Sequence, residues 1–184
     1  MKRILLISIL LVITVGLSFS QMAYKKGDQV INLGIGLGGF AGAYGGSSGI
    51  GITGGYEYGV TENISLGGVV GYSSSSETVF GDYGWKYTYI VIGARGAYHA
   101  DLFHNPNIDT YGGIMLGYNI VSASSTGTLP TYYGYGYPSY SASASYLEYG
   151  IFVGGRYYFN PHWAVQAELG YGLGILNIGI AYKL

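Results

Sequence analysis

Apolar and polar residues alternate with a period of two along most of the chain after residue 21. The last ten residues, 175–184, show the pattern most clearly. One parity is wholly apolar and the other is small or polar; the apolar positions are Leu176, Ile178, Ile180, Tyr182 and Leu184. This pattern predicts a β-strand with one apolar face. A hydrophobic strand at a chain end needs a partner strand and apolar surroundings, both of which closure of a membrane β-barrel supplies.

Eight such segments occur along the chain, each about ten residues long, the length expected of tilted strands that cross a bilayer. We expect strands at 29–38, 49–60, 63–73, 86–99, 108–121, 145–159, 162–171 and 175–184. The pattern therefore predicts an all-β fold: an eight-stranded antiparallel, up-and-down transmembrane β-barrel.

The parity opposite the apolar face carries the charges in the interiors of the strands. These charged residues are Glu57, Arg95, Glu148, Arg156, Glu168 and Lys183. A charged Lys or Arg facing lipid at mid-depth costs about 2–4 kcal/mol, so we place this face in the lumen. A soluble sandwich also alternates, but its outer face would be rich in Lys and Glu rather than in glycine. The membrane barrel is the better interpretation.

Connections between the predicted strands alternate in length. The connections 61–63, 100–107 and 160–162 are short, whereas 39–48, 74–85 and 122–144 are longer. Short periplasmic turns and longer external loops are typical of outer-membrane barrels, with both termini on the periplasmic side. The connection 172–174 is the exception, because it is as short as a turn.

The N-terminus has the pattern of a secretory signal peptide. Lys2 and Arg3 precede the apolar stretch 4–17, and Ser18-Phe19-Ser20 forms a small-x-small cleavage site. The alternative, a transmembrane anchor, is disfavoured because the apolar stretch is short for a span. We therefore expect residues 1–20 to be the signal peptide and residues 21–184 to be the outer-membrane barrel domain, with no further domain after it.

Composition narrows the class of protein further. The chain has no cysteine, so disulfides and thiol chemistry are excluded. Its net charge of −1 and its lack of a basic patch argue against nucleic acid as a partner. Glycine (34) and tyrosine (22) are abundant, while charged residues make up only 9%. Aromatic residues also gather toward the strand ends, which predicts two interfacial girdles. We place the periplasmic girdle at Tyr58, Tyr98, Phe103, Tyr157, Phe159, Trp163 and Tyr182, and the external girdle at Tyr72, Trp85, Tyr87, Tyr118 and Tyr171.

Four stretches together with the C-terminus resemble the small OmpA/OmpX-like outer-membrane β-barrel domains. The stretches are YEYGVTENISLG (56–67), ARGAYH (94–99), GGRYYFNPHW (154–163) and AELGYG (167–172). Gly179, Tyr182 and Leu184 are similar to the family's C-terminal assembly signal, Gly-x-x-aromatic-x-hydrophobic, although Leu stands where Phe is usual. The resemblance implies an outer-membrane location and recognition of the last strand by the barrel-assembly machinery. It specifies architecture rather than activity.

The lumenal charges are the first candidate for chemistry. An eight-stranded barrel is just wide enough for side chains to fill, so we expect these charges to pair as a structural network. The alternative is a proton or ion path, or a carboxylate pair that acts as acid and base. Histidines His99, His104 and His162 fall near the predicted periplasmic turns and are interpreted as polar turn residues. Their spacing does not suggest a metal site, and a lipid-modifying enzyme would need such residues at the outer leaflet.

The external segment 131–140 is the second candidate. It places Tyr132, Tyr133, Tyr135, Tyr137 and Tyr140 among Gly, Ser and Pro. Tyr with Ser and Gly is the composition of adaptable binding surfaces, but it is equally that of low-complexity loops without a partner. We therefore expect a non-enzymatic protein without a cofactor, embedded in outer-membrane lipid. Its role is structural or adhesive through external loops, toward an extracellular protein or surface ligand. A narrow channel for protons or small solutes is the alternative, and an outer-leaflet lipid-modifying enzyme is the remote one.

Overall fold

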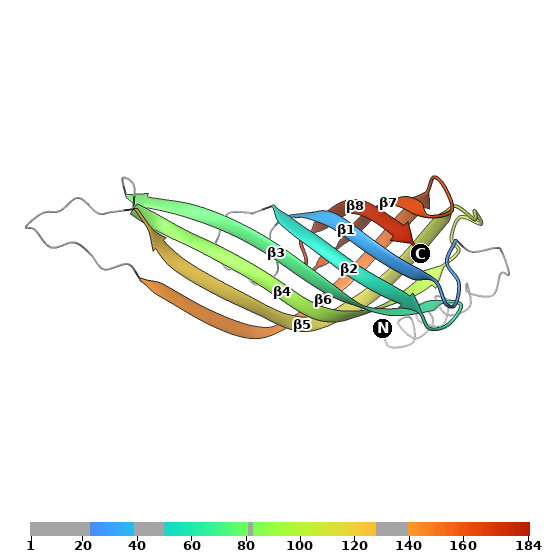
Figure 1. The fold of residues 1–184 in the computed structure, drawn as a ribbon, viewed down its shortest axis with the longest axis horizontal. Helices are drawn as coiled ribbons and strands as arrows, with labels where there is room; N and C mark the ends of the chain where they lie inside the picture. Colours follow the sequence, from blue (N-terminus) through green and yellow to red (C-terminus); the bar gives the residue numbers. More distant parts are fainter. Residues whose placement is uncertain (1–22, 39–49, 81–82, 128–139) are drawn as a thin grey trace, which may run out of the picture.

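The computed structural model describes residues 23–38, 50–80, 83–127 and 140–184, and these form an all-β closed barrel (Figure 1). The eight strands are β1 (Gln29–Leu37), β2 (Gly51–Gly59), β3 (Ile64–Phe80), β4 (Tyr83–Ala100), β5 (Ile108–Thr126), β6 (Ser141–Tyr158), β7 (Trp163–Tyr171) and β8 (Leu176–Lys183). Each strand pairs antiparallel with its sequence neighbours, and β1 pairs with β8 to close the barrel. The predicted eight-stranded up-and-down barrel is confirmed.

The outer face of the barrel is apolar, as the alternation predicts. Leu33, Leu116 and Ile151 are 56%, 56% and 64% exposed, and the same face of every strand offers similar side chains. The inner face buries the charges: Glu57, Arg95, Glu148, Arg156 and Glu168 are each at most 7% exposed. This inversion of the usual soluble pattern suits a protein whose surroundings are lipid.

Glycine on the inner face lets neighbouring strands approach closely. A Cβ added at Gly67 would lie 2.0 Å from the carbonyl oxygen of Tyr56, and one at Gly179 would lie 2.1 Å from that of Leu33. No real Cβ fits at such distances, so any side chain at these positions would force the strands apart. The abundance of glycine on the lumenal parity is thus a packing requirement of a narrow barrel.

Four strands are longer than the pattern predicts. β3 to β6 have 17–19 residues, whereas β1, β2, β7 and β8 have 8 or 9. In Figure 1, β3 to β6 continue well beyond the point where the other strands end. The predicted loops 74–85 and 122–144 are therefore wrong in part, because 74–80, 83–85, 122–126 and 141–144 are strand. We call residues 74–79, 83–89, 121–126 and 141–146 the projecting sheet.

The projecting sheet inverts the polarity of the barrel wall. Its outer face carries hydroxyls in cross-strand rows, with Ser74 opposite Thr88, Thr88 opposite Ser122 and Ser122 opposite Ser143. Trp85 and Tyr87 share the parity of buried Arg95 and face inward, so their assignment to the external girdle is wrong. The outer face changes from apolar to polar because its surroundings change from lipid to water.

Within the described ranges, no helix is long and apolar enough to cross a membrane. Residues 1–22 lie outside the described part of the chain, so the signal peptide and the start of the barrel domain at residue 21 stay predictions.

A charge on the outer face of β5 should reveal where lipid ends. We expect Leu116→Arg to lower the free energy of unfolding in lipid vesicles by about 2–4 kcal/mol, because the guanidinium would face the bilayer interior. Ser122→Arg lies on the same face of the same strand but in the projecting sheet, and should change it by less than about 1 kcal/mol. Urea unfolding measures both, and equal losses would contradict the assignment of the two faces.

Candidate functional site

Arg156 is the centre of a buried ion-pair network in the lumen. Its side chain is fully buried and donates from Nη2 to Glu57 Oε1 at 2.6 Å and from Nη1 to Asp109 Oδ2 at 3.4 Å. Its Nε donates to Gln166 Oε1 at 3.3 Å, and its guanidinium lies 4.5 Å from the ring centre of Tyr111. Strands β2, β5, β6 and β7 thus meet at one side chain.

Arg95 on β4 extends the network toward the external side. It donates from Nη2 to Glu168 Oε1 at 2.8 Å, and its Nε lies 3.6 Å from Glu57 Oε1. Tyr111 also donates to Glu168 Oε1, at 2.8 Å, and the Arg95 guanidinium stacks 4.0 Å from the ring centre of Phe152. Glu57 therefore lies between two arginines, and each guanidinium is covered by an aromatic ring.

Four of the six predicted lumenal charges are brought together: Glu57, Arg95, Arg156 and Glu168. The other two are not. Glu148 is buried beside Asn119, whose Nδ2 donates to it at 3.2 Å, and no ion pair to it is present among the described residues. Lys183 lies at the periplasmic mouth, where it pairs with Asp28 Oδ2 at 3.0 Å and stacks over Tyr158.

The interpretation of His99 as a polar turn residue is wrong. It is completely buried on the inner face of β4, with Nδ1 2.7 Å from Asp109 Oδ1 and Nε2 2.9 Å from Ser65 Oγ. Its parity matches that of Arg95, four residues earlier, so the alternation contained the signal. The order Ser–His–Asp is that of a nucleophile relay, but Ser65 is only 1% exposed, so a substrate could not reach it. The relay links β3, β4 and β5 as a structural element.

The segment before β1 closes the periplasmic end of the lumen, which the sequence pattern did not predict. Tyr24 is 3% exposed and stacks on His99 with ring centres 3.6 Å apart. Its hydroxyl donates to the carbonyl of Ile64 at 2.8 Å. Burial raises the pKa of the Tyr24 phenol, and the nearby carboxylates of Asp109 and Glu57 raise it further, so the phenol stays neutral.

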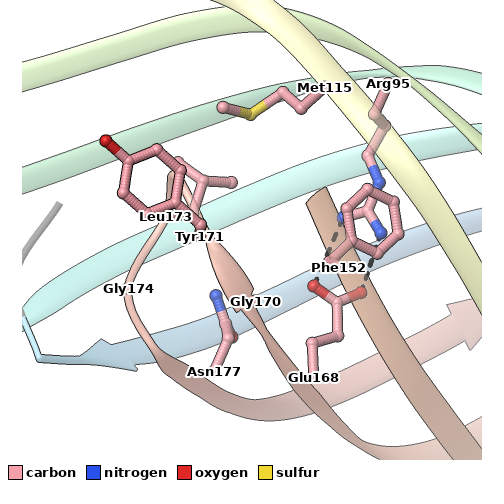
Figure 2. Close-up of a pocket in the computed structure, with 9 residues that line it drawn as sticks. All are labelled: Arg95, Met115, Phe152, Glu168, Gly170, Tyr171, Leu173, Gly174 and Asn177. Carbon is pink, nitrogen blue, oxygen red and sulfur yellow. Dashed lines mark hydrogen bonds and ion pairs between the residues drawn. The ribbon is translucent and has the colours of Figure 1, made fainter. Parts of the chain in front are cut away.

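The space left in the lumen is small. Figure 2 shows the cavity next to the network, where Arg95 and Glu168 meet across from Met115 and Leu173. It offers about 20 Å³ to the centre of a water molecule, which is room for about one water. Above it, Val69, Val91 and Met115 form an apolar cluster against which Tyr89 packs. At this level of the barrel, the described side chains fill the lumen.

The remaining histidines, His104 and His162, lie in connections between strands. His162 Nδ1 lies 2.9 Å from the carbonyl oxygen of Lys183, and His104 has a left-handed backbone with φ of 52°. In the described residues, no group of three or more His, Asp or Glu side chains is placed to hold a metal ion.

The C-terminal candidates and Tyr140 lie at opposite ends of the barrel. Gly179 sits where only glycine fits, Tyr182 packs edge-on against Trp163 at 4.8 Å, and Leu184 is 61% exposed. Tyr140 is 56% exposed at the external end, and its amide donates to Ser125 Oγ. The other four loop tyrosines lie outside the described residues; they are Tyr132, Tyr133, Tyr135 and Tyr137.

The outer membrane protein beta-barrel domain family matches residues 9–180, nearly the whole chain. The chain belongs to this family. As an outer membrane β-barrel protein it resides in the outer membrane, in contact with its lipids. No curated protein matches the chain.

Solved structures show the same fold. The barrel is similar to Ail, the attachment invasion locus protein of Yersinia pestis, with a TM-score of 0.58 and 16% identity, covering 86% of this chain and 99% of Ail. Ail in complex with the heparin analogue sucrose octasulfate has a TM-score of 0.57 and 17% identity, covering 86% of this chain and 99% of that one. Neisserial surface protein A has a TM-score of 0.51 and 13% identity, covering 85% of this chain and 94% of that one. At these identities the likeness shows the fold alone.

Removal of Arg156 should destabilise the barrel strongly. We expect Arg156→Ala to lower the free energy of unfolding by about 3–5 kcal/mol, because Glu57 and Asp109 would lose a buried partner. Lys86→Ala, at an exposed cation of the projecting sheet, should change it by less than about 1 kcal/mol. Thermal unfolding in detergent micelles compares the two variants. An Arg156→Ala profile that matches the parent would refute a stabilising role for the network.

Proposed function

We propose that this outer membrane barrel is a non-enzymatic surface-interaction protein that displays the projecting sheet and its external loops to partners outside the cell. The observation that carries the proposal is the extension of β3 to β6 beyond their four shorter neighbours. An extension of six or seven residues lengthens a strand by about 20 Å, at about 3.3 Å per residue. A barrel that only filled the membrane would have no use for such an extension.

The projecting sheet offers backbone groups at two edges. β3 pairs with β2 only as far as Ser73, and β6 pairs with β7 only from Ile151 onward. Among the described residues, no strand therefore lies beside the outer edge of 74–79 or of 141–145. Exposed edges pair readily with extended segments of other chains, so the sheet provides a contact surface as well as a support for loops.

The external segment 131–140 supplies the side chains for contact. Its five tyrosines provide large rigid rings at a low entropic cost, among small residues that adapt to a partner. Tyr140 stands at its base, directly beside β5 of the projecting sheet. The name of one structural neighbour, an attachment invasion locus protein, agrees with a role in attachment.

The lumen supports neither alternative function. The cavity next to Arg95 holds about one water, which disfavours a channel, and the buried Ser65 disfavours hydrolysis. Single-channel steps in a planar bilayer would favour transport instead. At the opposite end, we propose that β8, with Gly179, Tyr182 and Leu184, presents the assembly signal to the barrel-assembly machinery during insertion.

Replacing the loop tyrosines tests the proposal. Tyr→Ser at 132, 133, 135, 137 and 140 keeps the loop length, and we expect it to reduce adhesion of cells displaying the protein at least tenfold. Adhesion is counted on cultured epithelial cells and on a basement-membrane extract. Lys26→Ala, at the periplasmic end, is the matched control and should leave adhesion unchanged.

Deletion of residues 131–140 should have the same effect, provided that the barrel still folds. Folding is checked by the mobility difference between heated and unheated protein on a denaturing gel. Adhesion retained by both variants would remove the loop from consideration, and adhesion no higher than in cells without the protein would refute the surface-interaction role.

A further inference from the structure

The inner face of the projecting sheet carries a row of aromatic rings. β4 places Tyr83, Trp85, Tyr87 and Tyr89 on this face at alternate positions. The lowest of these rings, Tyr89, packs on the cluster that closes the lumen, so the rings above it stand beyond the filled barrel. We call Tyr83, Trp85 and Tyr87 the aromatic face.

Small residues lie beside the rings. Tyr87 lies opposite Ala123 on β5, and Ala123 lies opposite Ala142 on β6. The two alanine side chains are much smaller than the tyrosine ring at the end of this row. The strands that would stand across from it, β1, β2, β7 and β8, are short, and in the described residues none of them reaches this level.

Hydroxyl groups border the aromatic face, and charge is nearly absent. On the β3 side Tyr87 lies opposite Ser75, and on the β5 side Trp85 lies opposite Ser125. The projecting sheet has only two charged residues, Glu77 on the inner face and Lys86 on the outer face. This face has one acid, Glu77 opposite Trp85, and no cation, so it offers no charged partner to a polyanion.

An uncharged sugar chain has the matching chemistry. One face of a pyranose ring is a patch of C–H groups that stacks on an aromatic ring, and its edge is lined with hydroxyls that exchange hydrogen bonds with Ser and Tyr. A peptide would be held mainly through its backbone at the sheet edges, not through stacked rings. We propose that the aromatic face binds a neutral glycan.

The glycan arrives from the medium rather than from the surrounding leaflet. The outer face of the sheet, with its rows of Ser and Thr, is the one turned away from the barrel axis. The aromatic face has the inward parity of Arg95, and among the described residues the four short strands end below its level. This inference rests on the proposed surface-interaction role and names the class of ligand for it.

Fluorescence of Trp85 gives a direct test. The chain has two tryptophans, and Trp163 at the periplasmic end can be replaced by Phe so that Trp85 is the only one left. The Trp163→Phe protein in lipid nanodiscs is titrated with maltoheptaose, cellohexaose, chitohexaose and a mannan oligosaccharide. We expect a saturable change in emission with at least one of them. Tyr87→Ala should weaken that binding about tenfold or more, since it removes a stacking ring.

Thr88→Ala changes the neighbouring residue on the opposite face and is the matched control, with affinity expected to stay the same. The inference is overturned if no neutral oligosaccharide binds, if Thr88→Ala weakens binding as much as Tyr87→Ala, or if only sucrose octasulfate binds. It is also overturned if only lipopolysaccharide in the nanodisc changes the emission. Adhesion that depends on the loop tyrosines while no glycan binds would reject this inference alone and leave the proposed function standing.

Discussion

Closure of the β-barrel is the constraint on which the rest of the structure depends. In the hydrocarbon of a bilayer there is no water to satisfy a free N–H or C=O, and each unsatisfied group costs several kcal/mol. The pairing of β1 with β8, from Val30 opposite Lys183 to Leu37 opposite Leu176, removes the last two edges from the lipid. With only eight strands, closure leaves an interior that side chains must fill.

A filled interior decides the character of the lumen. Charges placed there lose their hydration, so they are tolerated only with partners close at hand. Arg156 meets this condition through Glu57, Asp109 and Gln166, and Arg95 does so through Glu168 and Glu57. The result is a lumen filled by paired side chains, which leaves the part of the protein outside the membrane for contact with partners.

The surrounding medium sets the polarity of each face. In the barrel wall the outer face is apolar and the inner face polar, because lipid lies outside. In the projecting sheet the order is reversed, with hydroxyls outside and Trp85 and Tyr87 inside. An apolar face outside the membrane is stabilised by a partner that covers it, and this supports the proposed surface-interaction role.

Period-two alternation was enough to predict the fold, the eight strands and the inward parity of Glu57, Arg95, Arg156 and Glu168, but not the place of Asp109 in their network. From Ser74 and Ser122 onward, apolar and polar positions no longer alternate clearly, because the outer face carries hydroxyls. A hydroxyl-rich strand has the composition of a loop, so the pattern did not predict the projecting sheet. The burial of His99 could be predicted, because its parity equals that of Arg95, although its position near a strand end suggests a turn residue. The burial of Tyr24 could not be predicted, since it depends on a tertiary contact with His99 that no local sequence pattern records.

The depth of the membrane along the outer face of β4 tests the central claim most directly. The chain has no cysteine, so single cysteines can replace Ile92, Ile90, Thr88 and Lys86 and carry a nitroxide label. Collision with oxygen reports lipid, and collision with a water-soluble nickel chelate reports water. We predict that positions 92 and 90 lie in lipid and that positions 88 and 86 lie in water. Lipid at 88 and 86, or water at 92, would contradict a wall whose polarity follows its surroundings.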